Sequence, residues 1–172
     1  KTVSYYNQDK SQWMDGPWRT EPDKVQWSDP ATGYPCVITR ADAGALCGYV
    51  GVEPSHPLYG KYPNDTPVHL SCHGGWNFST ACQEAPEGYG VCHIPEPGQP
   101  DLVWWLGFDC GHAYDRTPGC EATMQQIAAS TGRDDLVTSI ISRSERAKYR
   151  DLAYVKTVVA HLAAQLKEVA AS

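Results

Sequence analysis

One stretch of this sequence, residues 103–115 (VWWLGFDCGHAYD), combines the pattern of a buried strand with a group of polar side chains. Residues 103–108 are almost wholly apolar, which suits one strand inside a sheet. The residues that follow surround a glycine, which is typical of a turn, and include Asp109, Cys110, His112 and Asp115. Because a rigid strand that ends in reactive side chains is a common way to fix a site, we expect a functional site here.

The other strand patterns predict a small, mostly antiparallel sheet. Residues 36–40 and 46–52 are rich in β-forming residues and flank turn residues 42–44, so they predict a hairpin. Residues 68–78 have the composition of a third strand, interrupted by two glycines, and residues 103–108 make a fourth. These strands follow one another closely in the chain, which favours antiparallel pairing.

Helical patterns replace the strand patterns after Pro118. Residues 121–130 predict a short helix that ends at a Thr-Gly pair, and residues 134–141 predict a second helix or an extended segment. Ser142 and Glu145 match a capping box, so we expect the long C-terminal helix to begin there. The predicted fold class is therefore α+β, with two or three helices and the longest one packed on the sheet.

An apolar seam runs along the C-terminal helix with alternating steps of three and four residues. Its members are Leu152, Val155, Val159, Leu162, Leu166 and Val169. Packing over the sheet is one explanation for this seam. A homodimer through the helix is the alternative, because the spacing is a strict heptad.

The chain of 172 residues fits a single domain, residues 1–172. Residues 1–35 predict an extended lead-in rich in aromatic residues and proline, which either covers the core or forms the wall of a pocket. Residues 36–115 hold the sheet with its long loops, and residues 119–172 are helical.

Charge and hydropathy exclude two classes of partner. The net charge of −6 argues against a nucleic-acid-binding protein, because phosphate binding requires clustered Lys and Arg. No run of 18 apolar residues is present, so no membrane span is expected. The acidic balance favours a small-molecule substrate that is neutral or cationic.

The chain has seven cysteines, an odd number that cannot all pair within one chain. Two interpretations of them stay open. They are Cys36, Cys47, Cys72, Cys82, Cys92, Cys110 and Cys120. In a secreted protein we would expect three disulfides and one free thiol; in a cytosolic protein, mostly small buried thiols. The chain is large enough to fold without disulfides, which favours a cytoplasmic protein.

The first candidate site is a metal centre. His73, Asp109 and His112 provide two imidazoles and one carboxylate, the ligand set of a catalytic zinc site with a position open for water. Glycines beside His73 would allow a close approach of backbone or substrate. Asp115 would be the general base or a fourth ligand. Alternatively, His112 caps a turn and Asp109 accepts backbone hydrogen bonds.

The second candidate is a thiol nucleophile, formed by Cys47 with His73 and Asp109. These residues follow the sequence order used by papain-like enzymes, but Cys47 lies in a predicted strand. A catalytic cysteine usually begins a helix, whose dipole lowers the pKa of the thiol. Cys110 beside His112 is a variant of the same idea.

A structural zinc site is the third candidate, although no CxxC pair is present. Its potential ligands are Cys72, Cys82, Cys92, His93, Cys110 and Cys120.

The motifs GALCGYVGV (44–52), HGG (73–75) and WWxGFDCxH (104–112) resemble those of small proteins of unassigned function encoded by phages and bacteria. The resemblance covers roughly residues 15–165. It implies a cytoplasmic setting and one compact domain, and it supplies no activity.

The sequence thus predicts a metal-dependent hydrolase, with zinc the expected metal and a small ester, amide or phosphoryl compound the substrate. A non-catalytic binding module with an aromatic-rich surface is one alternative, and a Cys-His-Asp thiol hydrolase is another.

Overall fold

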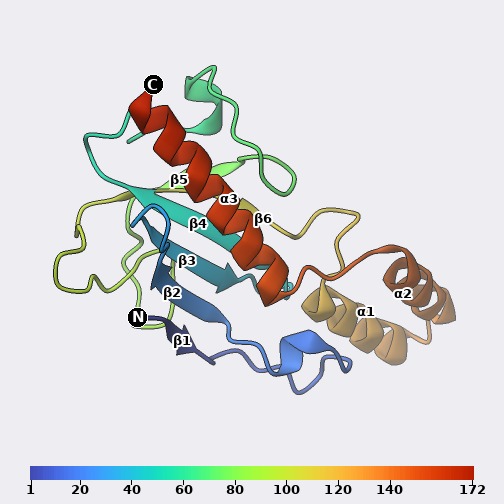
Figure 1. The fold of residues 1–172 in the computed structure, drawn as a ribbon. Helices are drawn as coiled ribbons and strands as arrows, with labels where there is room; N and C mark the ends of the chain where they lie inside the picture. The colour runs from blue at the N-terminus through green and yellow to red at the C-terminus, as the bar shows by residue number, and fades with distance from the viewer.

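The computed structural model, which describes residues 1–172, has one antiparallel sheet of six strands and three α-helices (Figure 1). The strand order in the sheet is β1-β2-β3-β4-β6-β5. The strands are β1 (Val3–Tyr5), β2 (Lys24–Ser28), β3 (Pro35–Arg40), β4 (Leu46–Val52), β5 (Phe78–Thr80) and β6 (Trp104–Asp109). The predicted α+β fold with a mostly antiparallel sheet is confirmed.

Strand β4 lies at the centre of the sheet, and every one of its residues is buried. It pairs with β6 in a register that places Cys47 opposite Asp109 at the end of β6. At Gly48 an added Cβ would lie 2.6 Å from Val159 of the covering helix and 2.7 Å from Phe108. Glycine therefore allows the helix and two strands to pack closely at this point.

The covering helix is α3 (Leu152–Ala171), which crosses one face of the sheet (Figure 1). Its apolar seam faces the strands, and four seam residues are completely buried there, namely Val155, Val159, Leu162 and Leu166. The predicted packing of the C-terminal helix on the sheet is thus confirmed. A homodimer through α3 stays a prediction, and the seam itself is occupied within the chain.

The other helices are α1 (Pro118–Thr131) and α2 (Asp134–Arg146), which pack against each other beyond the start of α3 (Figure 1). Helix α1 ends at Gly132 in the left-handed conformation, as expected of the Thr-Gly pair. The predicted start of the long helix at Ser142 is wrong, because Ser142 and Glu145 lie inside α2. Helix α3 begins instead at Leu152, and the side chain of Asp151 caps it by accepting a hydrogen bond from the backbone N–H of Tyr154.

Two predictions about the sheet are corrected. The lead-in supplies strands β1 and β2, and it also forms a 3₁₀ turn at Pro17–Arg19. The predicted strand at residues 68–78 is limited to Phe78–Thr80, and a 3₁₀ turn at Pro63–Asp65 precedes this segment. Gly74 and Gly75 have φ values of 72° and 88°, which a strand cannot adopt.

Cys82 and Cys92 form a disulfide, and the other five cysteines are free. The pairing removes two potential ligands from the structural zinc candidate. No helix in the structure combines the length and apolar character needed to cross a membrane.

Candidate metal centre

Three side chains with metal-binding atoms converge beyond the end of β6. One ligand atom from each of His73, His112 and Asp115 lies within 4.8 Å of the other two. His73 comes from the loop before β5, and the other two residues come from the turn that follows β6. We call these three residues the triad.

The turn after β6 brings His112 and Asp115 together. The backbone N–H of Asp115 donates to the carbonyl of His112 at 2.9 Å, which closes the turn. Asp115 also forms an isolated β-bridge with Lys148, in the segment between α2 and α3. The chain thereby holds the two ligands against the start of α3.

Gly74 allows the loop that carries His73 to approach this turn. An added Cβ at Gly74 would lie 2.4 Å from the ring of His112, a distance that real Cβ atoms do not adopt. Its φ of 72° also favours glycine. The close approach expected beside His73 is therefore observed, and it is an approach of backbone to His112.

The carboxylate of Asp115 is the centre of the triad and has no exposed surface. Both of its oxygens lie 2.9 Å from Nε2 of His73. Oδ2 is also 3.0 Å from Nδ1 of His112 and accepts a hydrogen bond of 3.0 Å from the His112 backbone N–H. Burial alone would raise the pKa of Asp115, but these hydrogen bonds outweigh it and hold that pKa below its usual value.

The ring of His73 is held at both nitrogens. Nε2 faces Asp115, and Nδ1 lies 2.9 Å from the hydroxyl of Tyr154 on α3. Because the Asp115 carboxylate is ionised, Nε2 carries the proton that it donates, and Nδ1 accepts from Tyr154. A ring fixed in this way has little freedom to rotate out of the site.

Arg150 and Tyr114 complete the surroundings of the triad. The Nε of Arg150 is 3.6 Å from Asp115 Oδ1, and its guanidinium lies over the ring of Tyr154 at 4.7 Å. The ring of Tyr114 stacks on His112 with centroids 5.2 Å apart and an angle of 3° between the planes. Tyr114 is about half exposed, so it forms the outer wall of the site.

Asp109 lies beside the triad rather than within it. Its Oδ1 is 3.7 Å from Nε2 of His112 and accepts a hydrogen bond of 2.6 Å from the side chain of Asn77. Its Oδ2 accepts from the backbone N–H of Gly111 at 3.1 Å. The side chain of Asp109 keeps 39% of its surface exposed, whereas that of Asp115 is fully buried. The close cluster therefore contains Asp115 where we expected Asp109.

Cys47 has no histidine partner in the structure. Burial first, and the charge of Asp109 second, raise the pKa of Cys47 to about 11, so its thiolate form is disfavoured at neutral pH. The pKa of Cys110 is raised as well, by burial and by the nearby charge of Asp115. His73 hydrogen-bonds to Tyr154 and Asp115 instead. This arrangement weighs against the thiol candidate.

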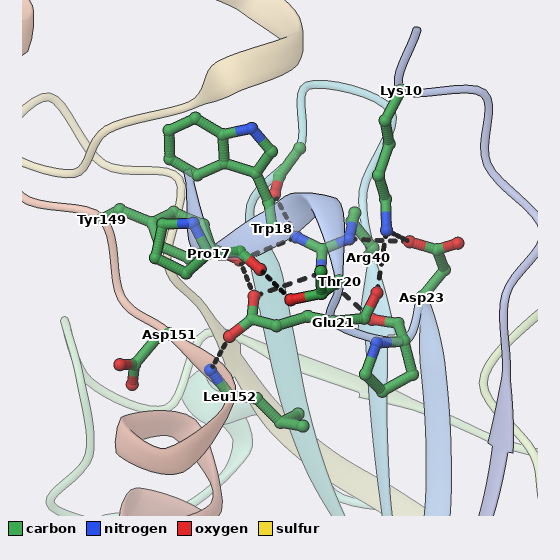
Figure 2. A network of polar contacts seen from close by, with 12 residues as sticks. Lys10, Pro17, Trp18, Thr20, Glu21, Asp23, Arg40, Tyr149, Asp151 and Leu152 are labelled. Carbon is green, nitrogen blue, oxygen red and sulfur yellow. Dashed lines mark hydrogen bonds and ion pairs between the residues drawn. The ribbon is translucent and has the colours of Figure 1, made fainter. Parts of the chain in front are cut away.

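A network of polar contacts fixes the segment that carries Arg150 (Figure 2). The carboxylate of Glu21 accepts hydrogen bonds from the Tyr149 hydroxyl at 2.5 Å and from the Leu152 backbone N–H at 2.7 Å. Arg40, whose side chain is fully buried, contacts Glu21 at 3.4 Å and Asp23 at 2.9 Å. The lead-in thus anchors the start of α3, and with it one side of the site.

The tryptophans of the lead-in lie away from the triad, with Trp27 packed against the main core and the other two in a small separate cluster. Trp13 and Trp18 are buried and pack with Ala122 of α1, and Trp18 meets Tyr149 edge to face at 5.0 Å. The predicted cover over the main core is therefore observed for Trp27, whereas Trp13 lines a surface pocket beside Gln8.

Sequence reasoning missed Tyr154 and Arg150. Tyr154 lies on α3 between members of the apolar seam, and Arg150 lies just before this helix. Nothing in the local pattern links either residue to His73, which is 81 positions away from Tyr154. For Arg150 the one signal is the run of four polar or aromatic residues at 148–151, directly before the apolar seam; this run does not include Tyr154.

No protein-family model and no curated protein matches this sequence, and no solved structure matches the chain. Function is therefore inferred from the geometry of the triad.

Proposed function

We propose that the protein is a metal-dependent hydrolase that acts on a small ester, amide or phosphoryl compound, with zinc as the metal. The observation that carries the proposal is the convergence of His73, His112 and Asp115 on one point. Two imidazoles and one carboxylate form a ligand set of catalytic zinc sites, which keep a further position for water. When bound, zinc lowers the pKa of that water toward neutrality and polarises a carbonyl or phosphoryl oxygen.

The surroundings of the triad suit a metal site. Each histidine nitrogen that faces Asp115 would exchange its proton for the metal, and Nδ1 of His73 would then donate to the oxygen of Tyr154. Metal-binding histidines commonly donate their other ring nitrogen to such a partner, which fixes the orientation of the ring. Tyr154 is therefore proposed as a positioning residue.

We assign the two carboxylates different roles from those expected. Asp115 is buried and its pKa is low, so it suits a ligand better than a base. Asp109 is partly exposed and lies beside His112, so it suits the role of proton acceptor. The water oxygen forms a bond to the carbonyl carbon or phosphorus, and the bond to the leaving group breaks. The proton taken up by Asp109 passes to the leaving group.

The experiment compares zinc-dependent hydrolysis of p-nitrophenyl acetate and p-nitrophenyl phosphate by the native protein and by Asp109→Asn. We expect a loss of about 10²–10⁴-fold in kcat for the variant, with zinc binding retained, which is the usual contribution of a general base. Asp101→Asn, a change in an exposed loop residue, is the control. Zinc-loaded native protein that hydrolyses no ester, amide or phosphoryl substrate would contradict the proposal.

A non-catalytic binding module is the second candidate. It is favoured by a group of aromatic side chains at the surface, in which exposed Tyr62 meets Trp104 edge to face at 5.3 Å. A protein of this kind needs no metal at the triad, so metal analysis separates the two candidates.

We propose a cytoplasmic location for the protein. The resemblance to phage- and bacteria-encoded proteins favours a cytoplasmic location. The Cys82–Cys92 disulfide favours an oxidising compartment, because cytosolic thiols are kept reduced. We propose small molecules, rather than nucleic acids or membranes, as partners.

A further inference from the structure

A cavity of about 580 Å³ lies between the turn after β6 and helix α2. It is lined by Ala113, Tyr114, Ser139, Arg143, Arg146 and Ala147. Ser139, Arg143 and Arg146 are spaced four and three residues apart, so they lie on one face of the helix. That face is turned toward the turn that carries His112 and Asp115.

The cavity adjoins the triad. Tyr114 lines the cavity and stacks on His112, so the Tyr114 ring lies between the cavity and the triad. Arg143 Nη2 donates to the backbone carbonyl of Asp115 at 3.4 Å. A small molecule held in the cavity would therefore contact the same tyrosine ring that stacks on His112.

The two arginines in the cavity have no acidic partner. Arg146 Nε donates only to the carbonyl of Ser142 in its own helix, at 3.2 Å, and neither Arg143 nor Arg146 forms an ion pair. The arginines nearby differ in this respect, since Arg116 pairs with Glu121 and Arg133 pairs with Asp135. In a chain with a net charge of −6, two unpaired arginines that line one cavity form a local positive site.

Arg150 adds an independent observation on the triad side. Its Nε is buried and has no hydrogen-bond partner, and the nearest carboxylate oxygen, that of Asp115, is 3.6 Å away. Buried donors are normally paired, so this Nε can still donate to a hydrogen-bond partner. Arg143 and Arg150 both contact Asp115, the first at the backbone carbonyl and the second at the carboxylate, so two positive charges lie at this residue.

We propose that the substrate is a small molecule that carries a phosphate group, which Arg143 and Arg146 bind in this cavity, with the bond to be cleaved at the triad. The inference rests on the hydrolase proposed above. Arginine is suited to the role because its planar guanidinium donates two parallel hydrogen bonds to phosphate oxygens. The neutral or cationic substrate expected from the overall charge is thus replaced by an anionic one.

The test is titration of inorganic phosphate into the full-length protein by isothermal titration calorimetry, with and without bound zinc. The proteins are the native chain, the double variant R143Q/R146Q, the single variant Arg146→Gln, and the control Arg133→Gln. We expect phosphate binding by the native chain and the control, with at least about 10-fold weaker binding by the double variant. Arg146→Gln keeps the test valid if the double variant unfolds, because the native side chain contacts only its own helix; we expect it to weaken binding by at least about 3-fold.

Equal phosphate affinity in the native chain and the arginine variants would overturn the phosphate proposal, as would the absence of binding to the native chain at millimolar phosphate. Zinc content measured on the same samples separates the two proposals. Arginine-dependent phosphate binding without zinc binding would support the phosphate site and contradict the metal hydrolase. Zinc binding without phosphate binding would support the metal site and contradict the phosphate site.

Discussion

At the scale of single residues, the site depends on the carboxylate of Asp115. It is fully buried, and hydrogen bonds from two histidine rings and one backbone N–H converge on it. A buried carboxylate is stable as an ion only where such donors or a cation compensate for lost hydration. These three donors therefore account for the ionised state of the buried carboxylate.

The pKa of Asp115 predicts a specific dependence of stability on pH. Because this pKa is lower in the folded chain than the unfolded value of about 3.9, the ionised carboxylate stabilises the fold above pH about 4. That contribution is lost as the pH falls below 4 through the folded pKa. We expect the difference in free energy of unfolding between the native chain and Asp115→Asn to shrink from pH 4 to pH 2, as measured by urea denaturation. A difference that stays constant over this range would contradict the assignment.

Most of the grouping in the candidate site could be predicted, whereas the position of each carboxylate could not. Three of the residues proposed from sequence, His73, His112 and Asp115, do converge. The sequence could not tell whether Asp109 or Asp115 turns inward, since both lie three residues from His112 and the outcome depends on how the turn after β6 closes. Cys47 was correctly placed in a strand, but its burial was needed to show that its thiol is poorly activated.

At the scale of elements, the position of the site is set where α3 begins. Glu21 accepts hydrogen bonds from Tyr149 and from the Leu152 backbone N–H, and it contacts Arg40 in β3 (Figure 2). Tyr149 and Leu152 lie on either side of Arg150 in the chain, and Leu152 precedes Tyr154 by two residues. A substitution that weakens the contacts of Glu21 should therefore also loosen the segment that carries Arg150 and Tyr154.

We expect Glu21→Gln to lower the free energy of unfolding by about 1–3 kcal/mol, because hydrogen bonds to a charged group are lost inside a mostly buried network. Amide hydrogen exchange at Tyr149 and Leu152 should become faster than in the native chain. Glu168→Gln is the matched control, since Glu168 is exposed on α3 and forms no ion pair, and it should change stability by less than about 0.5 kcal/mol. Equal effects of the two substitutions would show that the network does not anchor α3.

Elements with a strong pattern could be predicted, and short irregular ones could not. The apolar run of β6 and the seam of α3 gave a correct fold class, because burial on one face leaves a clear period in the sequence. Strand β1 has three residues and β2 has five. Strands this short, next to many prolines and aromatic residues, show no clear alternation of apolar and polar positions. Residues 68–77 have the composition of a strand, but positive φ angles at two glycines prevent it.

At the scale of the whole molecule, the chain contains one disulfide, which lies outside the main core. The Cys82–Cys92 disulfide closes the loop beside β1 and β2, and five cysteines stay free. In denaturant without reductant we expect five reactive thiols per chain by Ellman titration. After reduction we expect all seven. Seven thiols before reduction would contradict the disulfide and favour the cytoplasmic setting.

The central claim is that the triad binds a metal, and elemental analysis by inductively coupled plasma mass spectrometry tests it most directly. The native chain, after incubation with zinc and removal of free metal, should retain close to one zinc per chain. His73→Ala and His112→Ala should lose it while remaining folded by circular dichroism. No retained metal in the native chain, or equal retention in both variants, would contradict the account.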